Sequence, residues 1–400
     1  MWPPVRQEAC RGRPGRTPPA APARHIVAVP LVPVYGHAAL RARLLDAHAR
    51  GALPASLLLH GPRGVGKQRL ALWLGQALVC AGGAADRPGG AACGRCQHCR
   101  YAEQYAHPDL AWYFPRPRLK DADAGPDEVK ADYAEARAER AARHGLYAPG
   151  SGSEALYVAT VRTLVRQAAV SPAMAARKVF VLGDAERMVA QEGADQAANA
   201  FLKLLEEPPA DTTLVLTSSE PGALLPTVRS RVVSVRVPPL AEADVRAFLA
   251  DPQVRAALDA AGGAAGDDDA RARRAGGAPG ALLGAAEQAA ADAEALRLLR
   301  AAEQGDRAER LRAAFGQGAA RARGAFSDVL DALTVRLHAA ARDGSLPRAP
   351  GDPRPRDARR ALGAARAVDA VERAKARAAG NVNPQLVTAE LVRELAEALR

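Results

Sequence analysis

The sequence predicts a doubly wound α/β fold with a parallel sheet, followed by helices. The first indication is the segment Leu57–Gln68, LLLHGPRGVGKQ, in which an apolar strand runs into a glycine-rich loop and a lysine that opens a helix. The second is a series of short apolar runs bounded by turn residues, with helical stretches between them, as in buried parallel strands. These further strands are expected at 109–114, 178–182, 213–217 and 232–237.

The bulk composition allows more than one domain and points to an anionic partner. The chain has 400 residues, 48% of them hydrophobic, a formal net charge of +11 and a pI of about 9.8. Such a charge favours nucleic acid as a partner, although arginine at tolerant surface positions explains it equally well. No apolar stretch reaches the roughly 20 residues of a membrane span, and no signal-peptide pattern is present. We therefore expect a cytoplasmic protein without membrane contact.

Residues 1–25 mix proline, alanine and arginine without periodicity. Five arginines against one glutamate make this stretch strongly basic, which predicts a disordered basic tail. A wrongly assigned start codon is the alternative. Further along, the pattern becomes helical, with Leu40, Leu44 and Leu45 on one face and Gly51 as a break.

The glycine-rich loop has the pattern of a phosphate cradle. Gly61, Gly64 and Gly66 let the backbone turn its N–H groups toward an anion, and Lys67 opens a helix whose N-terminus favours negative charge. The residue after the lysine normally holds the nucleotide's magnesium through a hydroxyl, but Gln68 stands there. A glutamine amide is a longer, neutral and weaker ligand for a hard cation. The loop is therefore expected to hold phosphate without hydrolysing it, and ATP binding is doubtful.

A second magnesium contact is expected at the end of the strand 178–182. If the register follows the strand, Gly183 takes the position of the metal-binding aspartate and Asp184 that of the residue that polarises the attacking water. A shift of one residue, with Asp184 as the metal ligand, is the alternative. Because glycine has no side-chain oxygen, Gln68 and Gly183 together predict that hydrolysis has been abandoned.

Four of the five cysteines fall in one short window, at Cys80, Cys93, Cys96 and Cys99. In a cytosolic chain such clustering argues for a metal and against disulfides. Four thiolates form a closed tetrahedral site for a structural zinc. An iron–sulfur cluster is the chemical rival, but its usual run has a further cysteine followed by proline. Replacement of one ligand by His98 is the other alternative.

Changes in composition divide the rest of the chain. Between 115 and 150 we expect a charged insertion whose helix is solvated on nearly all sides. After Pro238 the sequence becomes alanine-rich and helical, with a low-complexity stretch at 260–269 and a Pro- and Arg-rich loop at 346–357. The predicted units are a basic tail at 1–25, a P-loop domain at 26–238 with a cysteine module at 80–99, a small helical domain at 239–286 and a helical C-terminal domain at 287–400.

Several motifs together are typical of one known family. They are ANAFLKLLEEPP at 198–209, LPTVRSR at 225–231, HPDL at 107–110 and the four-cysteine insertion after the first helix of the P-loop domain. On these motifs the chain resembles the clamp-loader branch of the AAA+ ATPases, and within it the delta-prime subunits of bacterial DNA polymerase III. The resemblance covers residues 30–240 and is thinner beyond, where it rests on 276–282 and 381–386.

The resemblance implies roles for further residues. In this family the arginine at the position of Arg231 acts as a finger in the ATP site of the neighbouring subunit. Ser230 and Arg231 of the family's Ser-Arg-Cys motif are kept here, and Val232 replaces the cysteine. Thr217 falls at the polar position that senses nucleotide in active members. Active members also have a lid arginine that contacts phosphate, and this chain has Gly280 there.

The resemblance also implies a fold and a function. The fold is a P-loop AAA+ domain with a zinc-binding insertion, a small helical lid and an all-α C-terminal collar domain. The function is that of a non-motor stator subunit of the DNA polymerase III clamp loader, without ATPase activity of its own. Its partners are gamma/tau and delta subunits, the sliding clamp indirectly, and primed DNA through its phosphates. The alternatives are an active AAA+ ATPase of the gamma/tau or branch-migration type and a zinc-dependent nucleic-acid-binding module.

Overall fold

The computed structural model of the chain describes residues 31–119, 124–147, 154–188, 195–260, 267–316, 323–343, 358–379 and 383–399. All structural statements below concern these residues. The predicted basic tail at 1–25, with Cys10, and the loop at 346–357 lie outside them. Most of the low-complexity stretch at 260–269 also lies outside.

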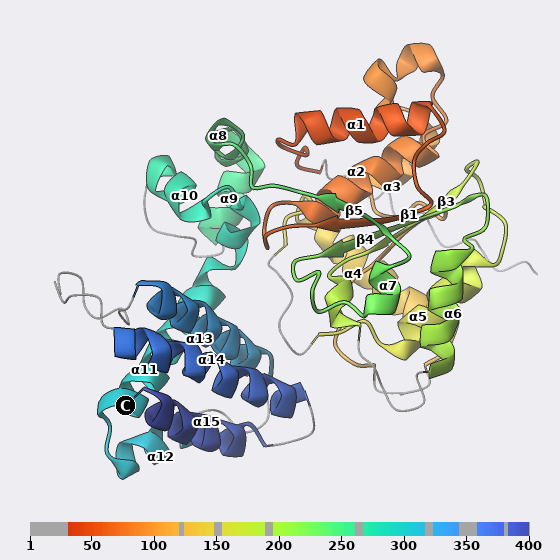
Figure 1. Cartoon of the computed structure of the whole chain (residues 1–400). Helices are drawn as coiled ribbons and strands as arrows, with labels where there is room; N and C mark the ends of the chain where they lie inside the picture. The colour runs from red at the N-terminus through yellow and green to blue at the C-terminus, as the bar shows by residue number, and fades with distance from the viewer. Residues whose placement is uncertain are drawn as a thin grey trace, which may run out of the picture.

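A sheet of five parallel strands forms the centre of the first part of the chain (Figure 1). The strands are β1 Ser56–His60, β2 Leu110–Tyr113, β3 Lys178–Leu182, β4 Thr212–Ser218 and β5 Val233–Arg236. They lie in the order β2-β3-β4-β1-β5, with Leu57 of β1 opposite Val215 of β4 and Val233 of β5. All five expected strands are present, so the predicted parallel α/β sheet is confirmed.

Helices cover both faces of this sheet (Figure 1). They are α1 Ala38–Ala49, α2 Lys67–Val79, α3 Gln97–Glu103, α4 Pro126–Ala142, α5 Val158–Ala168, α6 Asp195–Glu206 and α7 Pro226–Arg229, with 3-10 turns η1 Ala84–Asp86, η2 Pro88–Gly90 and η3 Ala185–Arg187. Helix α2 packs against the sheet and is contacted by α1 and α3, whereas α5 and α6 pack together on the other face. Every residue of β3 and β4 is buried, which explains the apolar runs VFVL in β3 and LVL in β4.

The helix in the charged insertion, α4, differs from the expectation of a solvated helix. Val129, Tyr133 and Ala136 are buried on one face of α4, and the hydroxyl of Tyr133 donates to the carbonyl oxygen of Phe114 at 2.7 Å. The Arg140 guanidinium carbon lies 3.3 Å from the centroid of the Phe114 ring. The prediction was wrong because the aliphatic stem and planar head of an arginine can pack on aromatic rings, so charge in the sequence does not require exposure.

The remaining helices follow the sheet. They are α8 Glu242–Ala250, α9 Pro252–Ala260, α10 Asp268–Ala275, η4 Pro279–Gly284, α11 Ala285–Gln304, α12 Arg307–Phe315, α13 Arg323–Asp343, α14 Ala358–Ala379 and α15 Pro384–Ala398. Local sequence explains several starts: Asp306 and Glu309 form a capping box at α12, and Asn383 caps α15, where Pro384 occupies the first turn. None of the described helices is both long and apolar enough to cross a membrane.

The buried apolar residues form two clusters. One extends from Val32 to Leu282 and joins the sheet, its helices and the small group α8–η4. The other runs from Ala291 to Ala396 within the bundle α11–α15, which Figure 1 shows set apart from the sheet. The expected boundaries at 238/239 and 286/287 stay predictions.

Asp109, in the HPDL motif, ties the start of β2 to the loop before β3. Its carboxylate accepts backbone N–H bonds from Ala173 at 2.6 Å and from Met174 and Ala175, both at 2.8 Å. Burial opposes ionisation, but these three bonds outweigh it and hold the pKa of Asp109 below its usual value. The carboxylate is therefore a structural clamp for this loop.

We predict that Asp109→Asn lowers the free energy of unfolding by about 2 kcal/mol at pH 7, because the amide NH₂ would face a backbone N–H donor. The folded-state pKa is lowered, so this stabilisation is present above the unfolded pKa and is lost as pH falls through the folded-state pKa. Urea unfolding followed by tryptophan fluorescence measures both effects. The exposed Asp46→Asn should cost no more than about 0.5 kcal/mol. Equal losses in the two variants would contradict the clamp.

Candidate functional site

The glycine-rich loop is placed by two neighbouring strands at the carboxyl end of β1. The Gly61 N–H donates to the carbonyl oxygen of Ser218 at 3.2 Å. A Cβ atom on Gly61 would lie 2.1 Å from the carbonyl oxygen of Val237, so only glycine fits at this position. Gly66 has a φ of 91° and precedes the first residue of α2, a backbone conformation that favours glycine. The loop therefore has the strand–loop–helix geometry of a phosphate cradle.

Lys67 is buried and turned onto its own loop. Its Nζ donates to the carbonyl oxygens of Gly61 and Pro62 and to the hydroxyl of Ser219, each at 2.9 Å. These three contacts use all three N–H donors of the ammonium group. Burial lowers the pKa of Lys67, although the nearby carboxylates of Asp184 and Glu186 act in the opposite direction.

The Gln68 side-chain amide lies between two groups that fix its orientation. The indole Nε1 of Trp112 donates to Gln68 Oε1 at 3.1 Å, and Gln68 Nε2 donates to Asp184 Oδ2 at 3.0 Å. Because the indole N–H can only donate, the amide oxygen must face Trp112. The one atom of Gln68 that could bind magnesium is thus already an acceptor, and its NH₂ group faces the acidic side chain.

Gly183 and Gln68 fit together in space. A Cβ atom on Gly183 would lie 2.4 Å from Gln68 Oε1 and 2.5 Å from its Cδ. An aspartate at this position would therefore collide with the amide. The two residues that the sequence predicts as departures from an active magnesium site are complementary in space, because the Gln68 side chain occupies the room beside Gly183.

The acidic residues after β3 are held by β4 and the residue that follows it. The Asp184 N–H donates to Thr217 Oγ1 at 3.1 Å, and Asp184 has a φ of 47°. Glu186 Oε1 accepts the N–H of Ser219 at 2.9 Å, whereas its buried Oε2 has no partner among the described residues. Burial and the neighbouring Asp184 raise the pKa of Glu186. Asp184 thus contacts both Gln68 and Thr217.

The turn η4 closes over the glycine-rich loop. The Gly280 N–H donates to the carbonyl oxygen of Gly64 at 2.9 Å, and a Cβ atom on Gly64 would lie 2.8 Å from the Ala281 nitrogen. A cavity of about 150 Å³ remains beside the loop. It is bounded by the segment before α1, the loop, the end of the insertion and η4, including Val32, Tyr35, Lys67, Tyr147, Asp184 and Gly280.

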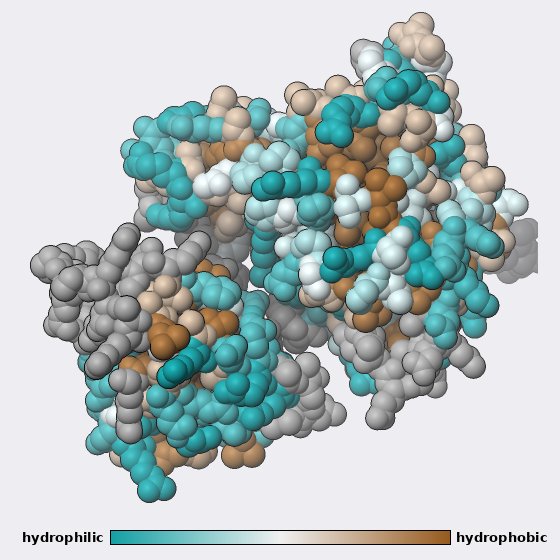
Figure 2. Space-filling model, in the orientation of Figure 1, coloured by the Kyte–Doolittle hydropathy of each residue, from teal (hydrophilic) through white to brown (hydrophobic). Residues whose placement is uncertain are grey.

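Arg231 lies on another part of the molecule, directly before the edge strand β5, and does not line this cavity. Its Nη1 donates to the carbonyl oxygen of Thr227 at 2.9 Å and contacts Ser230 Oγ at 3.2 Å. Val233 and Leu225 nearby are 50% and 52% exposed. Figure 2 shows apolar side chains gathered on the face where β5 lies in Figure 1. Arg231 thus belongs to a partly apolar surface.

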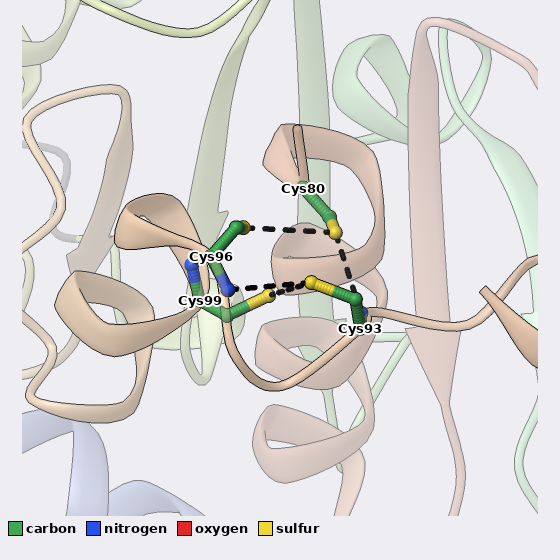
Figure 3. A group of neighbouring side chains, drawn as sticks. All are labelled: Cys80, Cys93, Cys96 and Cys99. Atoms are coloured by element: carbon green, nitrogen blue, oxygen red, sulfur yellow. Dashed lines mark hydrogen bonds between the residues drawn. The ribbon is translucent and has the colours of Figure 1, made fainter. Parts of the chain in front are cut away.

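The four clustered cysteines converge from the end of α2, the following loop and α3 (Figure 3). Their sulfur atoms all lie within 4.8 Å of one another, with Cys80 to Cys96 at 3.9 Å and Cys93 to Cys99 at 3.8 Å. Zinc–sulfur bonds of about 2.3 Å in a tetrahedron require sulfur separations of about 3.8 Å. The four residues therefore fit a tetrahedral metal ion.

Backbone hydrogen bonds favour the ionised form of Cys96, whereas burial raises the pKa of Cys99. The Cys93 N–H points to Cys80 Sγ at 3.3 Å, and the Cys99 N–H to Cys96 Sγ at 3.4 Å. Burial opposes ionisation of Cys96, but hydrogen bonds from the backbone lower its pKa to about 6. His98 pairs with His107 at 3.0 Å instead, and the metal-compatible group found in the described chain consists of the cysteines alone.

The structure brings most of the predicted site residues together, and their roles stay predictions. Lys67, Gln68, Asp184 and the loop glycines share one site, with Thr217 behind Asp184; the cysteines form a second site and Arg231 lies on a third surface. The sequence did not predict that Trp112 donates a hydrogen bond to Gln68, because a tryptophan in an apolar strand gives no sign of a polar contact. It also missed Glu206, which forms an ion pair with Arg231.

A glycine-rich loop and a lysine at the carboxyl end of β1 in a parallel sheet define a P-loop protein. The family profile described as "DNA polymerase III, delta subunit" matches residues 36–241, about half of the chain, and the chain belongs to this family. Membership of the clamp-loader family, as the sequence motifs indicated, is thereby confirmed.

Individual relatives agree with this assignment. The chain is 34% identical to DNA polymerase III subunit delta' of Pseudomonas aeruginosa over 182 residues. This matched region is 45% of this chain and 42% of the relative. The chain is also 30% identical over 217 residues to subunit gamma/tau of Mycobacterium bovis, covering 54% and 30%. The chain thus spans less than half the length of these curated relatives. Apart from these sequence relatives, the comparison with solved structures gives the crystal structure of a DNA polymerase III gamma subunit-related protein from Thermotoga maritima, which covers 89% of this chain and 100% of its own at 16% identity and a TM-score of 0.38, too low to bear on the assignment.

We predict that Gly183→Ala destabilises the chain by about 1–2 kcal/mol. The new methyl group displaces the Gln68 amide and breaks its bonds to Trp112 and Asp184. In a Gln68→Ser background the same change should cost less than about 0.5 kcal/mol, because the colliding amide is gone. Thermal unfolding of the four chains measures this coupling. Equal costs in both backgrounds would show that the two residues are independent.

Proposed function

We propose that the chain is a non-motor, delta-prime-type subunit of the DNA polymerase III clamp loader and offers Arg231 to the ATP site of a neighbouring subunit. The observation that carries this proposal is the Gln68 amide, whose oxygen accepts from Trp112 while its body lies against Gly183. Magnesium normally bridges the β- and γ-phosphates during hydrolysis. A site that has replaced both magnesium contacts lacks the groups that hydrolysis needs.

Arg231 has the chemistry and the position to act on a nucleotide in a neighbouring subunit. A guanidinium presents a planar fork of donors that matches phosphate oxygens and stabilises charge on a transferring phosphoryl group. Arg231 lies on a partly apolar surface at the edge of the sheet, away from the cavity beside its own loop. This position suits a contact with another subunit better than a contact with a nucleotide in its own chain.

The rest of the complex follows from the family. The neighbour is an ATP-hydrolysing gamma/tau subunit, and with a delta subunit the assembly loads the sliding clamp onto primed DNA. The group α8–η4 acts as the lid and the bundle α11–α15 as part of the collar that joins the subunits. Contacts of this chain with DNA are made to phosphates and weaken with salt.

We predict that the purified chain has no magnesium-dependent ATPase activity, and that Arg231→Ala lowers the kcat of the neighbouring ATP site by roughly 10²-fold or more in the reconstituted complex. A steady-state ATPase assay measures the activity of the purified chain and the kcat of the complex. The complex is assembled so that only the ATP site next to Arg231 is active. Arg229→Ala, two residues away, is the matched control and should keep the rate.

The competing function is an active ATPase of the gamma/tau or branch-migration type. Turnover by the purified chain that disappears in Lys67→Ala would establish that function and exclude the stator. In the complex, the stator proposal expects Lys67→Ala in this chain to leave turnover unchanged.

For the cysteine site we propose a structural zinc. Four thiolates fill all positions of a tetrahedral ion, so no position remains open for water or substrate. Zinc would join the end of α2 to the following loop and to α3. This loop has no buried residue in η1, so the ion would supply a link that apolar packing does not. An iron–sulfur cluster is disfavoured by the missing fourth cysteine of its usual run.

We predict one zinc ion per chain by elemental analysis. Cys96→Ser should lose the ion and lower the melting temperature by several degrees, because the ion stabilises only the folded chain. Cys10→Ser is the control and should keep the full metal content. Iron with visible absorbance, or unchanged zinc in Cys96→Ser, would refute this assignment.

A further inference from the structure

Arg231 follows helix α7 and is held by a second element as well as by α7. Its Nη2 forms an ion pair with Glu206 Oε1, 25 residues earlier in the chain. Glu206 is the last residue of α6 and belongs to the run LLEEPP, whereas Arg231 ends the run LPTVRSR. Two of the motifs that carry the family resemblance thus meet in one side-chain contact, and the phosphate loop takes no part in it.

The hydrogen bonds leave part of the guanidinium open. Arginine has five N–H donors. Thr227, Ser230 and Glu206 accept three of them, two on Nη1 and one on Nη2. The buried Nε–H has no acceptor among the described residues, and one donor on Nη2 is also left over. Arg231 is therefore fixed on one side and retains a donor for an outside acceptor.

This ion pair contributes little to the folding stability of the isolated chain. The Arg231 side chain is 28% exposed and that of Glu206 is 46% exposed. Ion pairs exposed to this extent contribute between about 0 and 1 kcal/mol. The contacts with Thr227 and Ser230 are local to α7, so without Glu206 the guanidinium could turn about its Nη1 anchors. A carboxylate from a different element removes this freedom.

We propose that Glu206 is a positioning residue for Arg231, which fixes the plane of the guanidinium so that its remaining Nη2 donor meets a phosphate oxygen in the neighbouring subunit. This inference rests on the proposed function, because it needs Arg231 to act on a phosphoryl group in trans. Orientation of a catalytic group before reaction lowers the barrier without adding a contact to the substrate. Glu206 therefore acts through Arg231 and does not touch the nucleotide.

The test uses the reconstituted complex with one active neighbouring ATP site, and compares Glu206→Ala with Glu207→Ala. Glu207 is the adjacent exposed acid in the same run, so its removal changes the charge equally but leaves Arg231 in place. We expect Glu206→Ala to lower kcat about tenfold with KM for ATP unchanged. Glu207→Ala should keep the rate, and Glu206→Gln should recover part of it, because its oxygen still accepts from Nη2. Both chains should co-purify with the other subunits as the unchanged chain does.

A double variant separates positioning from a general structural effect. In an Arg231→Ala background, Glu206→Ala should lower the rate no further, because the residue that it positions is gone. If Arg231→Ala itself leaves the rate unchanged, the proposed function fails. If Arg231→Ala abolishes turnover while Glu206→Ala matches Glu207→Ala or raises the rate, only the positioning role is refuted.

Discussion

The Gln68 amide links the separate parts of the nucleotide-type site. Its oxygen accepts from Trp112 on β2, its nitrogen donates to Asp184 after β3, and its body lies against Gly183. The two elements that hold magnesium in an active P-loop protein, the start of the helix after the loop and the end of a later strand, are here joined by the Gln68 side chain, which also bonds to β2. The hydrogen bonds of this buried amide connect α2 to β2 and to the segment after β3.

This arrangement is compatible with a phosphate cradle in a chain that, as we propose, does not hydrolyse ATP. Lys67 satisfies its donors on the loop and on Ser219, and Gly280 bonds to the backbone of Gly64. The loop is thus held by the Lys67 side chain and by the backbone of η4. Arg231 is separate from this network, and its contact with Glu206 joins α6 to the segment before β5. The two surfaces share no side chain, as the proposed contact of Arg231 with a neighbouring subunit requires.

Much of this could be predicted from local sequence. The five strands follow from apolar runs between turn residues, and the metal-compatible cluster follows from cysteine spacing, since short gaps bring thiolates onto one ion. The sequence indicated that Gln68 and Gly183 each replace a magnesium ligand. It did not indicate that the two residues lie against each other, because this contact depends on the spacing between α2 and the end of β3. The packing of α4 was mispredicted, since Arg140 lies against aromatic rings that the sequence separates from it.

By itself, the sequence determined which chemical groups exist: a phosphate loop without a magnesium hydroxyl, four thiols at metal-binding spacing, and an arginine before the last strand. These are local patterns, and short-range backbone preference and periodicity suffice to express them. Only the tertiary structure decided which groups meet. Gln68 and Trp112 are 44 residues apart, and Glu206 and Arg231 are 25 apart; such contacts arise when packing of the sheet and helices brings distant segments together, which no local pattern encodes.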